Sequence, residues 1–390
     1  MLPALRGRSR ALLAAVEASG LRGRGGAGFP TAAKLRAVAA GRRAVVVANG
    51  TEGEPASAKD KTLLRRNPHL VLDGVLVALE AVGGDEAVLA LSRADRAGRQ
   101  AIATALRERR RETRAIRVAA APDRFVAGEE SALVQWLDGG EAKPTFKPPR
   151  PFERGLGGRP TLVQNVETLA NLGLIARYGP DWFRELGTDD EPGSALVTVR
   201  GAVRRPGVAE VPIGASLRSV VELCGGLTAA PQAVLVGGYF GSWLSEHDFD
   251  VRLSDAGLRP YGAGLGAGTI VVLPASVCGV AETARVASYL ARESAGQCGP
   301  CVFGLASVAA ALNTIDRREP LAAAALERLP RLGSQISGRG ACAHPDGALR
   351  FVSSALEVFA HEVEHHLAGR CTALTDAPVL PVPPSQGEWR

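Results

Sequence analysis

The feature of this sequence that most constrains its fold is a run of glycines near the N-terminus. Five glycines fall within the nine residues 20–28, and Phe29-Pro30-Thr31 follows directly. Because glycine lacks a Cβ, its backbone can adopt left-handed angles and approach a ligand closely. Free N–H groups in such a loop, together with the positive end of a following helix, attract an anion. The interleaved Arg22 and Arg24 could also hold phosphate, so the run predicts a nucleotide-phosphate loop.

The topology around this loop is not the usual one for dinucleotide binding. Gly23, Gly25 and Gly28 match the spacing G-x-G-x-x-G, but that fingerprint requires a strand directly before it. Residues 11–20 instead predict an amphipathic helix that ends at Gly20 as its C-cap. We therefore expect a phosphate loop of non-standard topology, and the alternative interpretation is a flexible surface loop.

Alternating strands and helices follow the glycine run. Buried strands are predicted at 44–48, 87–91 and 116–120, with amphipathic helices between them and a helix from Gln164 to Tyr178. This alternation favours an α/β domain with a largely parallel sheet over residues 1–190. Ligands bind at the carboxyl ends of strands in such sheets, where the polar turn 49–55 is expected to lie.

The pattern of predicted secondary structure changes after residue 193. Short strands are predicted at 195–199, 208–211, 233–236 and 270–273, with a helix that starts at Ser216. This pattern indicates a β-grasp-like domain over 194–275, followed by a mainly helical domain over 280–370. The last segment, 376–390, contains four prolines and is expected to be poorly ordered.

Composition limits the possible functions. The net charge is +6, but the basic residues are scattered, so we expect no nucleic-acid binding. The sequence has no apolar run long enough to span a bilayer and no secretory signal, so we expect no direct membrane insertion. Six cysteines in a chain of this length suit a reducing compartment. The expected location is the cytoplasm, including the periphery of a membrane complex.

Three cysteines have a spacing typical of metal ligands. Cys298 and Cys301 form a C-x-x-C pair, and Cys342 follows 41 residues later. Thiolates at such spacings select zinc or an iron–sulfur cluster. Three thiolates are one ligand short of a closed site, which His344 could complete, with Cys371 as a more distant candidate. A redox-active dithiol would need a strand directly before the pair, and none is predicted there.

The other cysteines and histidines have simpler interpretations. Cys224 and Cys278 lie in apolar surroundings and are expected to be small buried side chains. His361, His365 and His366 lie on one predicted helix. Spacing i, i+4 can bind a metal. We favour a solvated helix for these histidines.

Five motifs in a fixed order together resemble a known family. They are the glycine run with Lys34, the turn 49–55, Gly128-Glu129-Glu130, the segment 164–168 and the segment 293–301. They resemble the flavoprotein subunit of NADH:quinone oxidoreductase (respiratory complex I) and the diaphorase subunits of NAD-reducing hydrogenases and formate dehydrogenases. The resemblance extends from about Gly20 to Leu367. It implies a Rossmann-like FMN domain, a soluble-ligand-binding β-grasp (SLBB) domain and a helical domain with a [4Fe–4S] cluster.

The resemblance also implies roles for individual residues. In this chain FMN would contact Gly23, Gly25, Lys34, Asn49, Glu52, Gly128, Glu129, Asn165 and Thr168. NADH would lie near Phe29, Lys34, Glu54 and Glu130. In the implied reaction, nicotinamide gives a hydride to FMN, and single electrons then pass to the cluster at Cys298, Cys301 and Cys342. Lys34 would offset negative charge on the flavin or a phosphate, while Glu54 and Glu130 would accept hydrogen bonds from the dinucleotide.

The chain departs from the family pattern at several positions. Ala295 stands where the family has its first cluster cysteine, Arg150 replaces an aromatic residue, and Phe125 replaces a tyrosine. Arg150 leaves NADPH open as the donor, because it could meet a 2′-phosphate.

Three functional hypotheses remain. One is an NADH- or NADPH-oxidising subunit that serves a thioredoxin-like [2Fe–2S] subunit, a ferredoxin or another redox subunit. The second, which Ala295 favours, is a cluster-less FMN-binding or scaffold subunit. The third is a redox-sensing dithiol protein.

Overall fold

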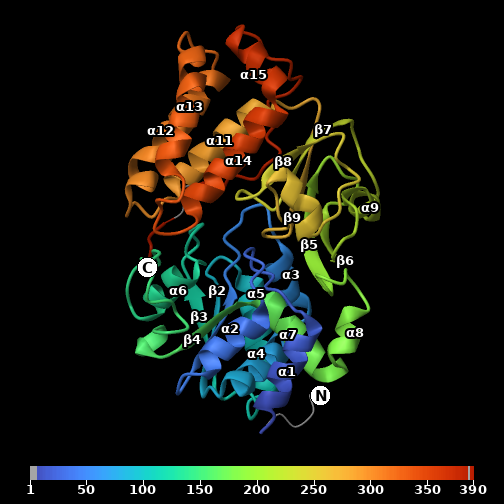
Figure 1. The fold of residues 1–390 in the computed structure, drawn as a ribbon, viewed down its shortest axis with the longest axis vertical. Coiled ribbons are helices and arrows are strands. Elements are labelled where there is room, and N and C mark those ends of the chain that lie inside the picture. Colours follow the sequence, from blue (N-terminus) through green and yellow to red (C-terminus); the bar gives the residue numbers. More distant parts are fainter. Residues whose placement is uncertain (1–6, 385–386) are drawn as a thin grey trace.

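The structure is a computed structural model that describes residues 7–384 and 387–390. It has three parts (Figure 1). An α/β domain with the N-terminal half of the chain lies at one end of the long axis. A small β domain lies beside the middle, and a bundle of helices occupies the other end. This arrangement confirms the predicted fold class.

The first domain is built on a four-stranded parallel sheet in the order β3-β2-β1-β4. Its strands are β1 (Val45–Gly50), β2 (Glu86–Ser92), β3 (Ile116–Ala121) and β4 (Thr161–Asn165). Because β1 pairs in parallel with β4, Asn49 and Asn165 lie side by side at the carboxyl ends. Gln164 was predicted to begin a helix, and this prediction is wrong. This residue belongs to β4, and the helix begins after it, at Val166.

Helices cover this sheet and meet it through a continuous apolar core. They are α1 (Ser9–Ser19), α2 (Thr31–Ala39), α3 (Lys59–Arg66), α4 (Pro68–Val82), α5 (Arg96–Glu108), α6 (Glu130–Leu137), α7 (Val166–Tyr178) and α8 (Pro180–Arg184). As predicted, α1 ends at Gly20 in the left-handed conformation. Helices α4 and α7 pack so closely that a Cβ on Gly74 would lie 1.8 Å from the carbonyl oxygen of Leu169. Each fully buried Leu or Val of this core contributes about 1.5–3 kcal/mol.

The second domain is a mixed five-stranded sheet in the order β6-β5-β9-β7-β8. Its strands are β5 (Ser194–Gly201), β6 (Gly207–Pro212), β7 (Pro231–Val236), β8 (Ser242–Ser245) and β9 (Thr269–Pro274). Helix α9 (Leu217–Leu223) is capped by Ser216, whose hydroxyl accepts from the Ser219 N–H at 3.1 Å, and α10 (Asp255–Leu258) is a short turn. Four strands match the sequence prediction, while β8 has only four residues and no alternating pattern to reveal it.

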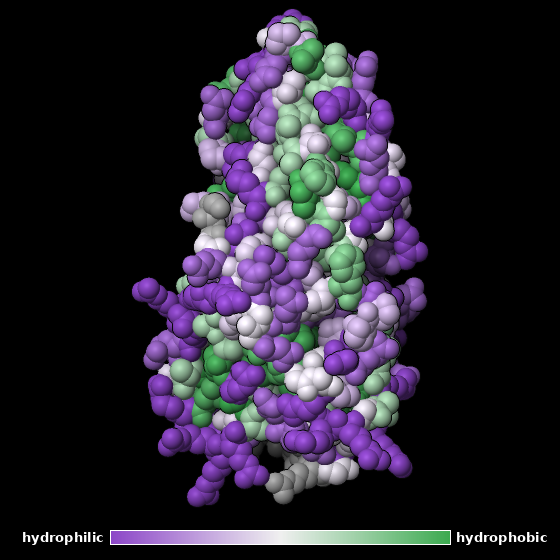
Figure 2. Space-filling view, turned by 90° about the vertical axis from the view of Figure 1, so that its left-hand side faces the viewer, coloured by the Kyte–Doolittle hydropathy of each residue, from purple (hydrophilic) through white to green (hydrophobic). Residues whose placement is uncertain are grey.

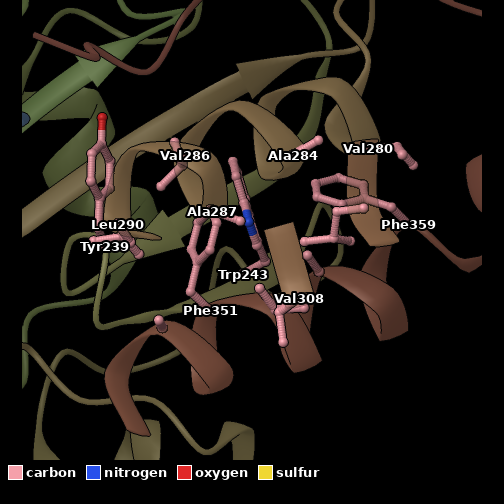
Figure 3. Close-up of a cluster of buried hydrophobic side chains, with 14 of the residues drawn as sticks. Tyr239, Trp243, Val280, Ala284, Val286, Ala287, Leu290, Val308, Phe351 and Phe359 are labelled. Atoms are coloured by element: carbon pink, nitrogen blue, oxygen red, sulfur yellow. The ribbon is translucent and has the colours of Figure 1, made fainter. Parts of the chain in front are cut away.

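The third part contains α11 (Gly279–Arg292), a π-helical turn (Pro300–Leu305), α12 (Ala306–Asp316), α13 (Ala322–Ile336), α14 (His344–Val358) and α15 (Ala360–Leu367). Its core continues into the β-grasp domain (Figure 3). Trp243 of β8 meets Phe359 edge to face at 5.1 Å between ring centroids and lies against Phe351 of α14. A Cβ on Gly279 would lie 2.4 Å from the Phe359 ring. The second and third parts therefore share one hydrophobic core.

The C-terminal segment, which was predicted to be poorly ordered, contacts the rest of the protein in its described part. Leu380 is 1% exposed, and its N–H donates to the Glu282 carboxylate at 2.7 Å. Tyr239 donates its hydroxyl to the Pro381 carbonyl. Farther on, the Arg124 guanidinium lies 4.2 Å from the centre of the Trp389 ring. The prolines favour an extended strap that packs against the rest of the protein and needs no core of its own.

Apolar side chains also reach the surface of the helical part. Figure 2 shows apolar residues gathered over the upper half of one face, among charged ones. Exposed apolar residues of this part include Val302, Phe303 and Leu321. In the part of the chain that the structure describes, no helix is both long enough and apolar enough to cross a bilayer.

Candidate functional site

The carboxyl ends of β1 and β4 bring two predicted asparagines together. Asn49 donates from Nδ2 to the Gly128 carbonyl at 2.7 Å, and its Oδ1 accepts from the Thr51 N–H at 3.2 Å. Asn165 caps α7 by accepting from the Glu167 N–H at 2.9 Å. A Cβ on Gly128 would lie 2.4 Å from Thr51 Oγ1. The predicted Gly128 is therefore required by the close approach of its own loop to the end of β1.

The glycine loop folds back over this edge of the sheet. The Gly23 N–H donates to the Phe29 carbonyl at 2.9 Å, which closes the loop just before α2. A Cβ on Gly25 would lie 3.2 Å from Asn165 Cβ. Among the described residues, no hydrogen bond uses the N–H groups of residues 25–28 as donors. The loop thus has the free backbone donors that phosphate binding requires.

The two arginines of the glycine run are bound by other groups of the protein. The Arg24 side chain is partly buried, and this burial lowers its pKa; its guanidinium donates to the Ser194 carbonyl at 3.0 Å. The Arg24 N–H donates to Thr168 Oγ1 at 2.8 Å, and Arg22 pairs with Glu191 at 3.6 Å. The prediction that these arginines hold phosphate is therefore wrong for Arg24. Both side chains tie the loop to the connection between the first two domains.

Charged residues from three segments meet beside the start of α6. Lys34 Nζ lies 3.1 Å from the Glu130 carboxylate, and Lys147 Nζ lies 3.2 Å from the same group. Lys147 also pairs with Glu129 at 2.6 Å, while Glu129 caps α6 by accepting from the Ser131 N–H. Each of these four side chains is about a quarter exposed. We call this group the lysine–glutamate cluster (Lys34, Glu129, Glu130, Lys147).

The Glu130 carboxylate is ionised at neutral pH. Burial pushes its pKa up, but the charges of Lys34 and Lys147 outweigh that effect and lower it. Lys147 was not among the predicted site residues. The feature that could have indicated Lys147 is the Lys-Pro-Pro sequence in the irregular connection 143–160. A lysine in such a connection does not serve the surface of a helix or strand, so a binding role could have been considered.

Two aromatic side chains near this cluster in the sequence are open to solvent. Phe29, at the end of the glycine loop, is 56% exposed, and Phe146, next to Lys147, is 68% exposed. Arg150 is exposed in the same connection. Exposed aromatic rings beside partly buried lysines suit a planar ligand that carries phosphate.

The acids of the turn 49–55 are used within the protein. Glu52 accepts from Ser57 Oγ at 2.7 Å and from the Asp60 N–H at 2.9 Å, so it caps the start of α3. Glu54 accepts from the Tyr239 N–H of the β-grasp domain at 2.8 Å. Backbone N–H groups of the chain already donate to both carboxylates. That Glu52 and Glu54 bind a cofactor therefore stays a prediction, and this geometry does not favour it.

The position of Glu54 predicts a pH effect on stability. Burial raises its pKa from 4.5 to about 7, against the hydrogen bonds from Tyr239 and Ala56. The folded state therefore holds its proton more tightly than the unfolded state, and this group's stabilising contribution is lost as pH rises from 4.5 to about 7. We expect Glu54→Gln to gain thermal stability relative to the parent between pH 5 and pH 8, measured as the difference in Tm at each pH.

Glu112→Gln is the control, because Glu112 is an exposed acid of the same domain that pairs with Arg109. Its Tm difference from the parent is expected to stay constant over the same range. An equally constant difference for Glu54→Gln would contradict the assigned titration.

The three predicted cluster cysteines lie near one another at the end of the helical part that faces the first domain. Cys301 is buried, and burial raises its pKa to about 12, while a hydrogen bond with the Ser294 hydroxyl lowers it. Cys298 and Cys342 both lie close enough to act on the Cys301 thiol. The soft thiol donor set suits an iron–sulfur cluster.

His344 lies two residues from Cys342 but is oriented by other groups. Its Nε2 donates to the Leu290 carbonyl at 2.8 Å, and its ring meets Phe125 and Phe240 edge to face. Burial lowers its pKa to about 4, so the ring is neutral. Its buried Nδ1 has no hydrogen-bond partner among the described residues. His344 as a fourth ligand stays a prediction, and Nδ1 is the nitrogen that could serve.

The lysine–glutamate cluster and the cysteine group adjoin each other. The charges of Glu129 and Lys147 act on the Cys342 thiol. On the same side, Glu293, which ends α11, pairs with Arg124 at 3.0 Å and accepts from the Phe125 N–H at 3.0 Å. The loop 124–129 therefore contacts the end of α11 at one end and carries Glu129 at the other.

A buried ion cluster joins the first domain to the second. Lys59 Nζ lies 2.7 Å from Asp60 and 2.8 Å from Glu167, and all three side chains are almost fully buried. Burial alone would lower the pKa of Lys59, but the two carboxylates reverse this and raise it. Glu167 also accepts from the Leu196 N–H of β5 at 2.8 Å. No periodicity in the sequence indicates this cluster, because Lys59 and Glu167 are 108 residues apart.

Comparison with known proteins gives three matches to family models. The Nuo51 FMN-binding domain matches residues 16–173, the SLBB domain matches residues 196–238, and the NADH-ubiquinone oxidoreductase-F iron-sulfur binding region matches residues 281–366.

Several curated proteins are similar over most of the chain. The NADH-quinone oxidoreductase F 2 subunit of Rhizobium meliloti is 35% identical over 372 residues, which cover 91% of this chain and 88% of that protein. The NADH-quinone oxidoreductase F subunit of Streptomyces coelicolor is 33% identical, covering 92% and 83%. The HndC subunit of the NADP-reducing hydrogenase of Solidesulfovibrio fructosivorans is 32% identical, covering 92% and 78%.

A solved structure is similar as well. It is the NAD⁺-reducing [NiFe]-hydrogenase in its H₂-reduced state, with a TM-score of 0.84 at 32% identity. The match covers 92% of this chain and 63% of that hydrogenase chain.

Proposed function

The chain belongs to the family of NADH-quinone oxidoreductase F subunits, and from this premise we propose that it oxidises NADH or NADPH and delivers the electrons to a partner redox protein. The observation that carries the proposal is the proximity of two groups of side chains. Lys34 of the lysine–glutamate cluster lies on α2, directly after the glycine loop, and the charges of Glu129 and Lys147 act on the thiol of Cys342.

The residues of the cradle fit FMN. The unused N–H groups of residues 25–28 suit its phosphate, and Asn49, Gly128 and Asn165 line the adjoining strand ends. When bound, FMN supplies an acceptor for a two-electron hydride and a donor of single electrons. We propose that these residues hold it.

The protein's own contribution is position and charge. Lys34 and Lys147 bring positive charge to a partly desolvated site, where it offsets negative charge on a phosphate or on a reduced cofactor. Glu130 holds both lysines in place and is ionised, so a free oxygen lone pair can accept from a ribose hydroxyl or a carboxamide of the dinucleotide. No side chain needs to transfer a proton in this scheme.

We propose that Cys298, Cys301 and Cys342 hold a [4Fe–4S] cluster with His344 Nδ1 or an exogenous ligand in the fourth position. A cluster with an incomplete cysteine set is expected to lose iron readily. Restoring the family's first cysteine with Ala295→Cys should therefore raise the iron retained per FMN severalfold, measured after anaerobic purification and desalting. Ala291→Cys, in the last turn of α11 and four residues before Ala295, is the control. Unchanged iron in Ala295→Cys would mean that the fourth position is already filled.

Ala295 also favours a second candidate function, a cluster-less FMN-binding or scaffold subunit. The visible spectrum of the anaerobically purified protein separates the two. Flavin bands with a broad iron–sulfur shoulder support electron transfer, while flavin bands alone, with no bound iron, support the scaffold.

We propose that the electron acceptor docks beside the cysteine group. Val302 and Phe303 follow Cys301 directly, and Phe303 is 74% exposed. An exposed apolar patch next to a redox centre suits a thioredoxin-like [2Fe–2S] subunit, a ferredoxin or another redox subunit. All six cysteines are free, which suits the cytoplasm or the cytoplasmic periphery of a membrane complex.

A further inference from the structure

A second group of metal-ligating side chains lies in the helical part, apart from Cys298, Cys301 and Cys342. The Sγ atoms of Cys278 and Cys371 and the Nε2 of His366 all lie within 4.8 Å of one another. Cys278 Sγ and His366 Nε2 are 3.3 Å apart. His366 was predicted to lie on a solvated helix, and this prediction is wrong, since the residue is 1% exposed.

Local structure brings these three residues together from distant parts of the chain. Cys278 is the N-cap of α11, and His366 lies in the last turn of α15. The segment after Cys371 is held beside Cys278, because the N–H groups of Leu374 and Thr375 donate to the Ser276 carbonyl at 2.9 and 3.1 Å. The convergence therefore follows from backbone hydrogen bonds as well as from the side chains.

The orientation of His366 is that of a metal ligand. Its Nδ1 lies 3.2 Å from the Ile315 carbonyl, which can only accept, so Nδ1 carries the proton. The Nε2 lone pair then faces the two sulfur atoms. A hydrogen bond from the far nitrogen to a carbonyl is the usual way that proteins set the tautomer of a ligating histidine.

The donor set fits zinc in both chemistry and size. Two thiolates and an imidazole are common Zn²⁺ ligands, and tetrahedral zinc separates its sulfur and nitrogen ligands by about 3.6 Å. Glu362 lies behind Cys278, with Oε2 3.7 Å from Sγ and 2.7 Å from the Gly279 N–H. A tetrahedral site requires a fourth ligand, which Glu362 or a water molecule could supply.

We propose that Cys278, His366 and Cys371 bind a structural Zn²⁺ ion that fastens the start of the C-terminal strap to α11 and α15. Binding forms two Zn–S bonds and one Zn–N bond and releases the two thiol protons to solvent. The ion would anchor the point from which the strap runs to Leu380 and onward to Trp389.

Zinc content of the full-length protein tests this proposal. We expect about one zinc per chain after anaerobic purification and dialysis against zinc-free buffer, by mass spectrometry of the metals. Cys371→Ser, in an exposed segment, should lower zinc to background. His361→Gln, an exposed position on the same helix, and Cys301→Ser should both keep it, which separates this site from the other cysteine group.

Alkylation of the native protein gives a second readout that does not depend on variants. Cys371, which lies in an exposed segment, should resist iodoacetamide until a zinc chelator is added, and then react. A Cys278–Cys371 disulfide would resist alkylation with or without chelator and yield only to reductant, which would overturn the proposal. Equal zinc in the parent and in Cys371→Ser, or free alkylation without chelator, would overturn it as well.

Discussion

Glu130→Gln is expected to lower kcat/KM for NADH about 10- to 100-fold in a ferricyanide assay, with FMN still bound. The substitution keeps the size of the side chain but removes the charge that holds Lys34 and Lys147 at 3.1 and 3.2 Å. A hydrogen bond to a charged group contributes about 1.5–3 kcal/mol, which corresponds to this loss of rate. FMN content, read from its absorbance after denaturation, separates a failed reaction from a failed cradle.

The matched control is again Glu112→Gln, which removes one carboxylate charge from the same domain outside the cluster. Glu54→Gln in the same assay tests the other acid predicted to bind the dinucleotide. Because the Glu54 carboxylate accepts from the Tyr239 N–H, we expect Glu54→Gln to lower the rate less than Glu130→Gln does. Parental activity in Glu130→Gln would remove this residue from the site, and a loss in Glu54→Gln equal to that in Glu130→Gln would restore Glu54 to it.

Lys59→Met is expected to destabilise the folded protein by about 3–5 kcal/mol, because it leaves buried carboxylates without their cation. Asp60 and Glu167 lie 2.7 and 2.8 Å from the lysine nitrogen, in a region from which water is nearly excluded. Burial already raises the pKa of Glu167, and Lys59 opposes that shift. Without Lys59 this pKa rises further. The loss of Tm should therefore be larger at pH 8 than at pH 5, where protonation relieves the unpaired charge.

Lys61→Met on the same helix is the control for Lys59→Met. Lys61 is about 30% exposed, and its Nζ lies 3.7 Å from Glu52, so its ion pair is partly solvated and contributes little. We expect a change of about 1 kcal/mol or less in Lys61→Met. Similar Tm values for the two lysine variants would show that the buried cluster does not stabilise the junction of the first two domains.

Local patterns predicted the elements that have their own apolar signature. The run 44–48 became β1 because consecutive β-branched residues suit a strand buried on both faces. Strand β4 was missed because its partner β1 lies far away in sequence, and only the pairing of Asn49 with Asn165 reveals its end. Short strands without alternation, such as β8, are decided by tertiary contacts in the same way.

In the candidate site, too, local sequence predicted some residues and failed for those whose partners are distant in sequence. The glycines and Asn49 could be predicted because backbone geometry and strand ends constrain residue type locally. The partners of charged side chains could not, since Arg24 reaches Ser194 and Glu54 reaches Tyr239 across domain boundaries. The burial of His366 could not be predicted from its own helix. Its partners are Cys278 at the start of α11, Ile315 in α12 and Cys371 after the end of α15.

The loop 124–129 is held at both of its ends, and this matters for the proposed function. Its first residues are clamped to Glu293 by an ion pair and a backbone hydrogen bond, and its last residue caps α6. This short span therefore links the start of α6 in the first domain to the end of α11 in the helical part. Because both of its ends are held, we expect it to limit movement of the proposed flavin site relative to the end of α11.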